Sequence, residues 1–179
     1  MNRTALYKPQ KQAGATFTDR FGWEIVSYFG SAATEYRAAT ENVALLDLTH
    51  TGRFKITGKD ALDLLNRLSS NKVDLLIPGI GAATVLPTNK GRVIDLLYLL
   101  ATDDGLLMMT SPQTRQRVAD WADFHTFLED MVVQDITETT GMITLLGPQA
   151  PKLLEHITDK VTGPMNPYES TRIIINDKE

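Results

Sequence analysis

The sequence predicts an α+β fold in which helices pack on an antiparallel sheet. Three observations predict this class. Short apolar runs bounded by turn residues alternate with segments of helical periodicity along the chain. The polar segments 88–91 and 102–105 end in glycine, which is typical of tight turns between antiparallel strands. A strand–Gly–helix pattern also occurs twice, which favours internal pseudo-symmetry.

The apolar runs and turn residues place the expected elements in order. Residues 14–29 predict one or two short strands, and Ser31 is a suitable cap for a helix that ends at Asn42. From residue 52 onward the expected order is β-α-β-β-β-α-β-β-α. The strands expected after residue 42 are 43–48, 52–57, 81–87, 92–101, 106–110, 132–136 and 142–146.

Ser111 and Pro112 are expected to begin a helix that reaches about Asp130. Its apolar residues recur at helical spacing and predict one buried stripe. That stripe consists of Val118, Trp121, Phe124 or His125, and Leu128.

The internal repeat relates residues 52–68 to residues 141–157. Each copy has a glycine, five strand residues, a second glycine and then an alanine three positions later, Ala61 or Ala150. The second glycine permits a tight turn from strand to helix. We expect residues 1–50 to pack as strands and a helix on a main α+β domain at 51–160. Residues 161–179 then begin a further, truncated segment.

Composition excludes several classes of function. The 179 residues carry a net charge of −4, which gives no basic footprint for nucleic acid. Cysteine is absent, so this chain offers no disulfide, thiol nucleophile or iron–sulfur ligand, and its three histidines show no metal-site spacing. The first residues lack a signal-peptide pattern and no apolar run is long enough to cross a bilayer. We therefore expect a cytoplasmic protein with no membrane partner.

Asp95 is the only charged residue in the apolar run 93–100. A carboxylate in a strand covered on both faces must be paired, protonated or turned toward a wet cavity. Asp95 is therefore a candidate catalytic acid, and equally a candidate structural carboxylate bonded to loop amides.

Several short motifs, in order along the chain, resemble the N-terminal half of glycine-cleavage T-proteins and their folate-binding relatives. The resemblance runs from Leu6 to Glu179, and because full members of the family are longer, it implies a truncated chain. The motifs lie at 22–24, 35–38, 44–54, 58–61, 88–95 and 145–150.

The resemblance implies that tetrahydrofolate, or a one-carbon derivative of it, binds in a central cavity. T-proteins use tetrahydrofolate to accept a one-carbon unit from an aminomethyl group, with release of ammonia. The family's key carboxylate is the second of two aspartates on the strand of Asp95, and here that position is Leu96. Because successive strand residues point to opposite faces, Asp95 replaces it only if the register shifts.

Two further family positions near folate depart from the pattern, since a tyrosine is replaced by Ala83 and an asparagine by Thr110. We expect Leu96, Tyr98 and Leu100 to make one wall of the cavity apolar with one hydroxyl, which suits a flat ring. The expected folate-binding residues are Thr51, Ala83, Leu96, Tyr98, Leu100 and Thr110.

A single aspartate followed by an apolar residue looks more like the YgfZ-type branch, which is linked to the maintenance of iron–sulfur enzymes. The resemblance thus implies a folate-binding accessory protein whose partner is an iron–sulfur or one-carbon enzyme. Two alternatives stay open: an aminomethyltransferase that uses Asp95 in a shifted register, and an interaction scaffold that has lost its ligand.

Overall fold

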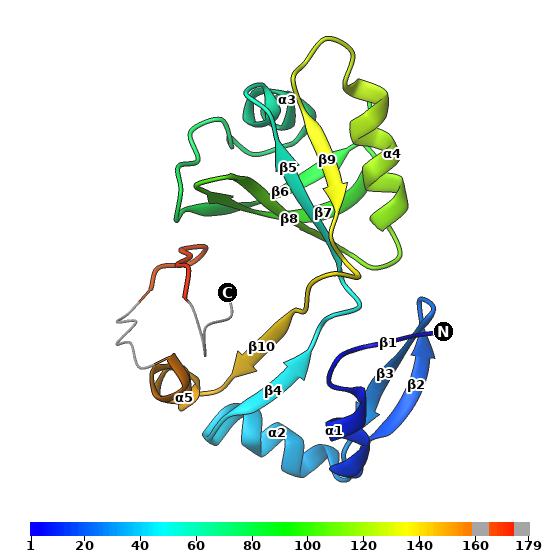
Figure 1. The fold of residues 1–179 in the computed structure, drawn as a ribbon, viewed down its shortest axis with the longest axis vertical. Coiled ribbons are helices and arrows are strands. Elements are labelled where there is room, and N and C mark those ends of the chain that lie inside the picture. The colour runs from blue at the N-terminus through cyan, green and yellow to red at the C-terminus, as the bar shows by residue number, and fades with distance from the viewer. Residues whose placement is uncertain (159–164, 174–179) are drawn as a thin grey trace. The chain divides into compact units, whose positions relative to one another are not determined.

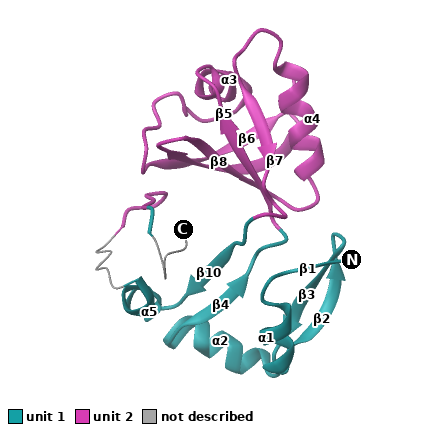
Figure 2. Ribbon diagram, viewed as in Figure 1, with its two compact units in different colours: residues 1–50, 140–164, 172–179 teal, residues 51–139, 165–171 magenta. Residues whose placement is uncertain are grey.

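The computed structural model describes residues 1–158 and 165–173 and divides the chain into two compact units (Figures 1 and 2). Unit 1 comprises 1–50, 140–164 and 172–179, and unit 2 comprises 51–139 and 165–171. Residues 140–158 therefore group with unit 1, whereas the sequence suggested that they continue a domain at 51–160. The segment expected to begin at residue 161 lies largely outside the described residues.

Unit 1 contains two small sheets and three helices among its described residues. In the first sheet β3 pairs with β1 in parallel and with β2 in antiparallel orientation. The second sheet is the antiparallel pair of β4 and β10. The elements are β1 (Asn2–Arg3), α1 (Tyr7–Gln12), β2 (Thr16–Arg20), β3 (Trp23–Tyr28), α2 (Ala32–Glu41), β4 (Ala44–Asp47), β10 (Ile143–Leu146) and α5 (Ala150–Thr158).

Unit 2 is built on a five-stranded sheet in the order β6-β7-β8-β5-β9, in which every described pair is antiparallel. The elements are β5 (Gly52–Thr57), α3 (Ala61–Leu68), β6 (Gly81–Pro87), β7 (Val93–Thr102), β8 (Gly105–Thr110), α4 (Arg115–His125) and β9 (Val132–Asp135). The predicted α+β class and the order of elements from residue 52 onward are confirmed.

Helices α3 and α4 cover one face of the unit 2 sheet, as Figure 1 shows. Leu97 and Leu99 of β7 are fully buried beneath them, together with Leu64 of α3 and Val118 of α4. The other strand residues point away from the helices and are more exposed, and we call the surface that they form the open face. It includes Lys55, Ala83, Val85, Leu96, Tyr98, Leu100, Leu107 and Met109.

Helix α4 is shorter than the sequence predicts, and only the first part of the expected stripe, Val118 and Trp121, packs in or against the core. It ends at His125, and its buried residues are Val118 and Ala122. Of the two residues offered for the next position of the stripe, Phe124 is 66% exposed and His125 is half-buried, and the expected Leu128 is 98% exposed. Past the helix end the Glu129 carboxylate accepts the N–H groups of two residues of the following loop, Phe127 and Leu128 (3.1 and 3.2 Å), so the loop satisfies its amides without further helix.

The two copies of the repeat adopt the same turn between strand and helix. Gly58 and Gly147 have φ angles of 110° and 109°, in the left-handed range that favours glycine. The N–H two residues after each glycine donates to the carbonyl of a residue that precedes an incoming strand. Asp60 donates to Asp130 (3.2 Å), and Gln149 donates to Asn42 (3.0 Å).

The structural repeat also extends upstream of the segment found in the sequence. Asp47 and Asp135 each accept the N–H of the threonine two residues later, at 3.0 and 2.9 Å. The hydroxyls of these threonines, Thr49 and Thr137, accept the N–H groups of Met142 and Arg53. Each copy is therefore a strand, an Asp-x-Thr turn, a second strand, a glycine and a helix.

The two copies exchange strands. The first strand of one copy, β4, pairs with the second strand of the other, β10. The first strand of that other copy, β9, pairs in turn with β5. This exchange explains why residues 140–158 group with unit 1: their strand finds its partner among residues 44–47.

Candidate functional site

Strand β7 separates the candidate residues onto two faces. Asp95 is 6% exposed and lies on the helix-covered side with Leu97, whereas Leu96 and Tyr98 are 44% and 41% exposed on the open face. A register irregularity does occur in β7, because Leu86 pairs with Asp95 and the next residue of β6 pairs with Val93. It precedes Asp95 and leaves the later alternation intact, so it does not turn the carboxylate toward the open face.

The Asp95 carboxylate accepts four hydrogen bonds, which is about its full capacity. The donors are the N–H of Leu96 (2.8 Å), the N–H and hydroxyl of Ser111 (both 2.7 Å), and the hydroxyl of Thr114 (2.6 Å). Ser111 and Thr114 belong to the turn that leads into α4. Asp95 therefore fixes the start of this helix against β7, as the structural reading of the sequence expects.

The open face is apolar around Tyr98. Ala83 lies directly opposite Tyr98 on one neighbouring strand, and Met109 lies opposite it on the other. Leu96 and Leu100 flank Tyr98 along β7 itself. Among the strand residues of this face that the structure describes, none is a carboxylate. The surface can therefore bind a flat ring by contact, and it lacks the acid on β7 that proton transfer there requires.

Thr110 does not lie with these residues, so its expected place on the open face is wrong. It is 2% exposed and shares the covered side with Met108, because β8 alternates regularly to its end. Thr110 pairs with Gly52, where a Cβ atom would overlap its hydroxyl. Thr51 immediately precedes β5, and its carbonyl accepts a hydrogen bond from the guanidinium of Arg53 (2.7 Å).

Arg53 is a buried charge that the sequence did not single out. Its side chain is bonded to the carbonyls of Thr51 and Thr137, and its N–H donates to the Thr137 hydroxyl (3.0 Å). Arg53 thus closes the junction between β5 and the end of β9. The signal in the sequence was an arginine beside the buried Phe54 near the start of β5.

Tyr168 is a second residue that the sequence did not identify. It occupies the third position of a turn that is closed by the N–H of Glu169 donating to the carbonyl of Asn166 (3.1 Å), with Pro167 at the second position. Its φ of 66° is the positive value that a type II turn requires there, usually met by glycine. For a residue with a Cβ this conformation costs about 1–2 kcal/mol. The ring of Tyr168 lies 6.3 Å from that of Tyr98, inclined by 33°.

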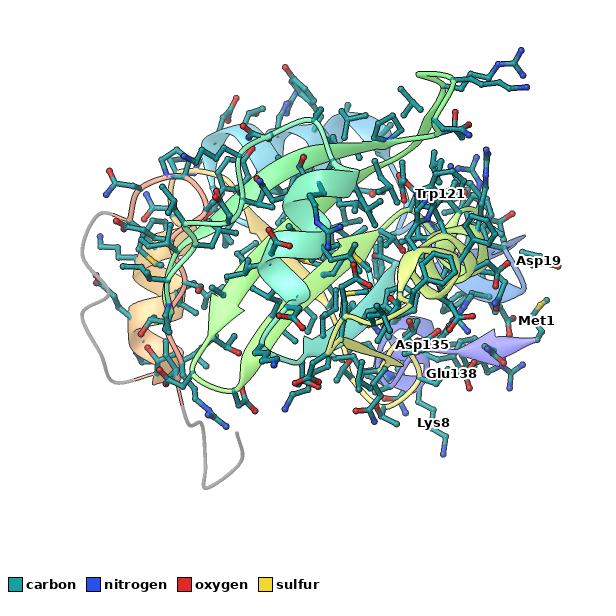
Figure 3. The ribbon with its side chains drawn as sticks, turned by 90° about the horizontal axis from the view of Figure 1, so that it is seen from above. Met1, Lys8, Asp19, Trp121, Asp135 and Glu138 are labelled. Carbon is teal, nitrogen blue, oxygen red and sulfur yellow. The ribbon has the colours of Figure 1, made fainter. Side chains whose placement is uncertain are left out.

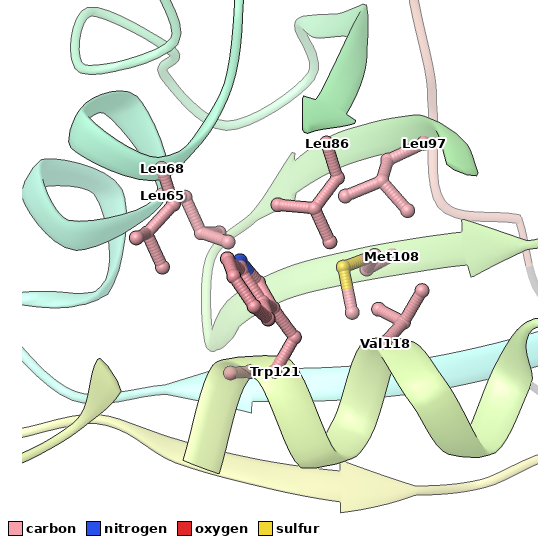
Figure 4. A pocket seen from close by; sticks show the side chains of 8 residues that line it. Leu65, Leu68, Leu86, Leu97, Met108, Val118 and Trp121 are labelled. Carbon is pink, nitrogen blue, oxygen red and sulfur yellow. The ribbon is translucent and has the colours of Figure 1, made fainter. Parts of the chain in front are cut away.

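One cavity in the interior of unit 2 is small. Figure 4 shows a cavity beneath α3 and α4 whose volume is about 10 Å³, enough for one water-sized sphere. Trp121 extends from α4 toward it, and its Nε1 is buried without a hydrogen-bond partner. A folate-sized molecule needs a far larger site than this cavity.

The charged groups of unit 2 mostly stabilise its turns and helix ends. Asp135 and Glu138, which lie near one another in Figure 3, both pair with Arg115 at the start of α4 (2.9 and 3.9 Å). The hydrogen bond from Arg67, followed by those from backbone N–H groups, lowers the pKa of Glu129 to about 2. Asp135 ends β9 but pairs with the buried Phe54, so it lies on the helix-covered side, and Glu129 lies in the loop before β9.

The described residues contain neither a candidate metal site nor a candidate membrane span. No group of three potential metal ligands occurs among them. No helix in the described part of the chain has the length and apolar character needed to cross a membrane.

Comparison with known proteins identifies relatives of this chain. An aminomethyltransferase from Bacillus pumilus (strain SAFR-032) is 28% identical over 170 residues, which cover 94% of this chain and 46% of the relative. The crystal structure of glycine cleavage system aminomethyltransferase T from Bartonella henselae matches with a TM-score of 0.80 and 20% identity. That match covers 87% of this chain and 43% of the other.

The chain thus spans less than half the length of these two relatives. The structural match supports the α+β fold, and membership of a family is established by the sequence comparison that follows. The family model of the GCVT N-terminal domain matches residues 6–174, which is nearly all of the chain. This chain therefore belongs to the GCVT N-terminal domain family.

Proposed function

We propose that this chain is the N-terminal part of a tetrahydrofolate-binding protein that acts as an accessory protein of the YgfZ type. The observation that carries the proposal is the opposite orientation of Asp95 and Leu96. The open face presents Leu96 where the family resemblance places a carboxylate, and Asp95 is turned away with all its acceptor positions occupied.

Binding of tetrahydrofolate, or a one-carbon derivative of it, is supported by the character of the open face. Leu96, Tyr98 and Leu100 together with Ala83 provide apolar contact area and one phenol hydroxyl, which suit a flat heteroaromatic ring. Thr51, next to β5, stays a proposed contact, while Thr110 is omitted because it faces α4. The proposed partner is an iron–sulfur or one-carbon enzyme, and the proposed location is the cytoplasm.

Calorimetry with tetrahydrofolate on the full-length protein tests the binding. We expect Leu96→Lys to weaken binding by about tenfold or more, because it places a charge within the apolar contact surface. The matched control is Val93→Lys, which changes a residue of the same strand that is 64% exposed and lies before the irregularity. If the wild-type protein does not bind at high micromolar ligand, the proposal is wrong and the scaffold reading is favoured.

Aminomethyltransferase activity is the second candidate, because a relative that matches 94% of the chain carries that name. An assay for ammonia release from an aminomethylated lipoyl carrier distinguishes the two functions. We expect no release, since no carboxylate of β7 lies on the open face to assist proton transfer. Release of ammonia by the wild type would refute the accessory role. If the release persists in Asp95→Asn, Asp95 takes no part in the reaction.

A further inference from the structure

We propose that Tyr168 is a ligand-binding residue that determines specificity for a flat, conjugated ring. This inference rests on the proposed function of the open face and adds a residue from a different segment of the chain. Tyr168 and Tyr98 together would form a platform of two rings on which the pterin ring of the ligand stacks.

The backbone at Tyr168 favours a different residue. Its φ of 66° lies in the left-handed region, and the third position of a turn with proline second is normally occupied by glycine. A bulky side chain at such a position is a true outlier, and outliers of this kind gather at functional sites. Local turn stability therefore does not account for tyrosine at this position.

Backbone contacts hold the turn against the edge of the sheet. The N–H of Ser170 donates to the carbonyl of Gly79 (2.8 Å), and Glu169 forms an antiparallel bridge with Ile80. The Tyr168 carbonyl lies so close to Gly81 that a Cβ there would come within 3.1 Å of it. These contacts place Tyr168 beside β6, the edge strand of the sheet.

The Tyr168 ring reaches across β6 to the second strand. The Tyr168 backbone lies beside Gly81 of β6, and the centroid of its ring lies 6.3 Å from that of Tyr98 on β7. The two tyrosines remain 41% and 45% exposed, so their contact leaves much of each ring in solvent. A third flat ring can therefore add to the pair by offset or edge-to-face packing.

Calorimetry on the full-length protein tests the platform, with tetrahydrofolate and with a tetrahydropterin that lacks the glutamate tail. We expect Tyr168→Gly to weaken binding of both by about five- to tenfold, since one aromatic contact is lost. Tyr168→Phe keeps the ring and should bind within about twofold of the wild type. Tyr168→Asn, which tolerates the left-handed backbone, should weaken binding like the glycine variant.

Thermal unfolding of the same variants separates binding from folding. We expect Tyr168→Gly to melt at the same temperature as the wild type or higher, because it removes backbone strain. The matched control Tyr28→Ala removes a tyrosine of similar exposure from β3 of unit 1 and should leave both affinities unchanged.

Each result supports or overturns a defined statement. If the wild type binds and the glycine variant binds equally well, the Tyr168 platform is wrong while the proposed function stands. A marked drop in the melting temperature of Tyr168→Gly would also overturn the Tyr168 platform. A loss of affinity for tetrahydrofolate with no loss for the tail-less tetrahydropterin would overturn it as well. If the wild type binds neither ligand, the proposed function fails and this inference fails with it.

Discussion

The two copies of the strand–Gly–helix repeat have the same backbone geometry in very different surroundings. In unit 2 the strand before the glycine lies in a five-stranded sheet, and Phe54 and Ile56 are essentially inaccessible. In unit 1 the equivalent strand belongs to a two-stranded sheet, and Ile143 and Leu146 are 51% and 41% exposed. The turn is therefore encoded by local hydrogen bonds and a glycine, while the depth of the core is decided by the number of strands around it.

The largest effects should come from the two glycines of the repeat. A Cβ at Gly58 or Gly147 would overlap the carbonyl oxygen of Asp130 or Asn42, and both backbones have positive φ. We expect Gly58→Ala to lower the free energy of unfolding of unit 2 by about 3 kcal/mol. Gly147→Ala should cost less, because Asp130 is also held by the Asp60 carboxylate (2.8 Å to its N–H) and can yield less than Asn42.

Hydrogen exchange measured on amides of β5 and β10 reports the two effects separately. A larger loss of protection in β10 for Gly147→Ala than in β5 for Gly58→Ala would contradict this ranking.

The threonines of the Asp-x-Thr turns should give the next largest difference. Thr137 is completely buried and Thr49 nearly so, and each hydroxyl accepts a backbone N–H of the exchanged strand. Valine at either position leaves that N–H without its acceptor, which costs about 1–3 kcal/mol when buried. Each hydroxyl also donates to a carbonyl of the same partner residue, that of Thr137 to Arg53 at 3.3 Å and that of Thr49 to Met142 at 3.5 Å. We expect Thr137→Val to be the more damaging, because Thr137 is completely buried and its hydrogen bond is the shorter of the two.

Chemical unfolding of the two valine variants, with Thr→Ser at each site as the control that keeps the hydroxyl, measures this difference. If Thr137→Val and Thr49→Val lower the free energy of unfolding equally, the hydrogen bonds of the turns, and not the burial of the threonines, determine the stabilisation.

The smallest expected effect is the pH dependence of the Asp47 turn. Burial alone would raise the pKa of Asp47, but polar interactions with Thr4, Thr49 and Gln10 together outweigh it and hold the pKa below its ordinary value of 3.8. A carboxylate with a lowered pKa stabilises the folded state above its ordinary pKa and loses this contribution as the pH falls through the folded value. The Thr49 amide resonance should therefore shift only below about pH 4, and it should lose this shift in Asp47→Asn.

The order of elements from residue 52 onward is predictable because it depends on strong local signals. Glycine-terminated turns bound β7, and the repeat marks both strand–glycine–helix junctions. The first strand and helix, β1 and α1, were missed because two and six residues are too few for a periodic pattern.

The end of α4 shows where periodicity fails. Leu128 continues the helical spacing of Val118 and Trp121, yet the helix ends at His125 and Leu128 is almost fully exposed. The Glu129 carboxylate, bonded to Arg67 (2.8 Å), satisfies the loop amides instead. The end of α4 thus depends on Glu129 in the loop and on its partner Arg67 in α3. The spacing of apolar residues does not reveal an interaction of this kind.

The candidate site was predictable in part. The alternation of β7 correctly separated Asp95 from Leu96, Tyr98 and Leu100. Thr110 was placed on the wrong face because its register with β7 depends on the exact length of the hairpin turn. Tyr168 is distant in sequence from Tyr98, so only the tertiary fold brings the two rings together.

The exchanged strands also constrain the order in which the chain assembles. Unit 2 pairs strands within residues 51–139, whereas β4 of unit 1 has no partner until β10, which begins at Ile143, has been synthesised. While the chain is unfolded, the residues between β4 and β10 form one long loop, and closing this loop has a high entropic cost. The cost is lower once the residues within the loop have collapsed. During synthesis on the ribosome, β4 therefore stays unpaired until β10 emerges. An unpaired strand edge of this kind can pair with the wrong strand.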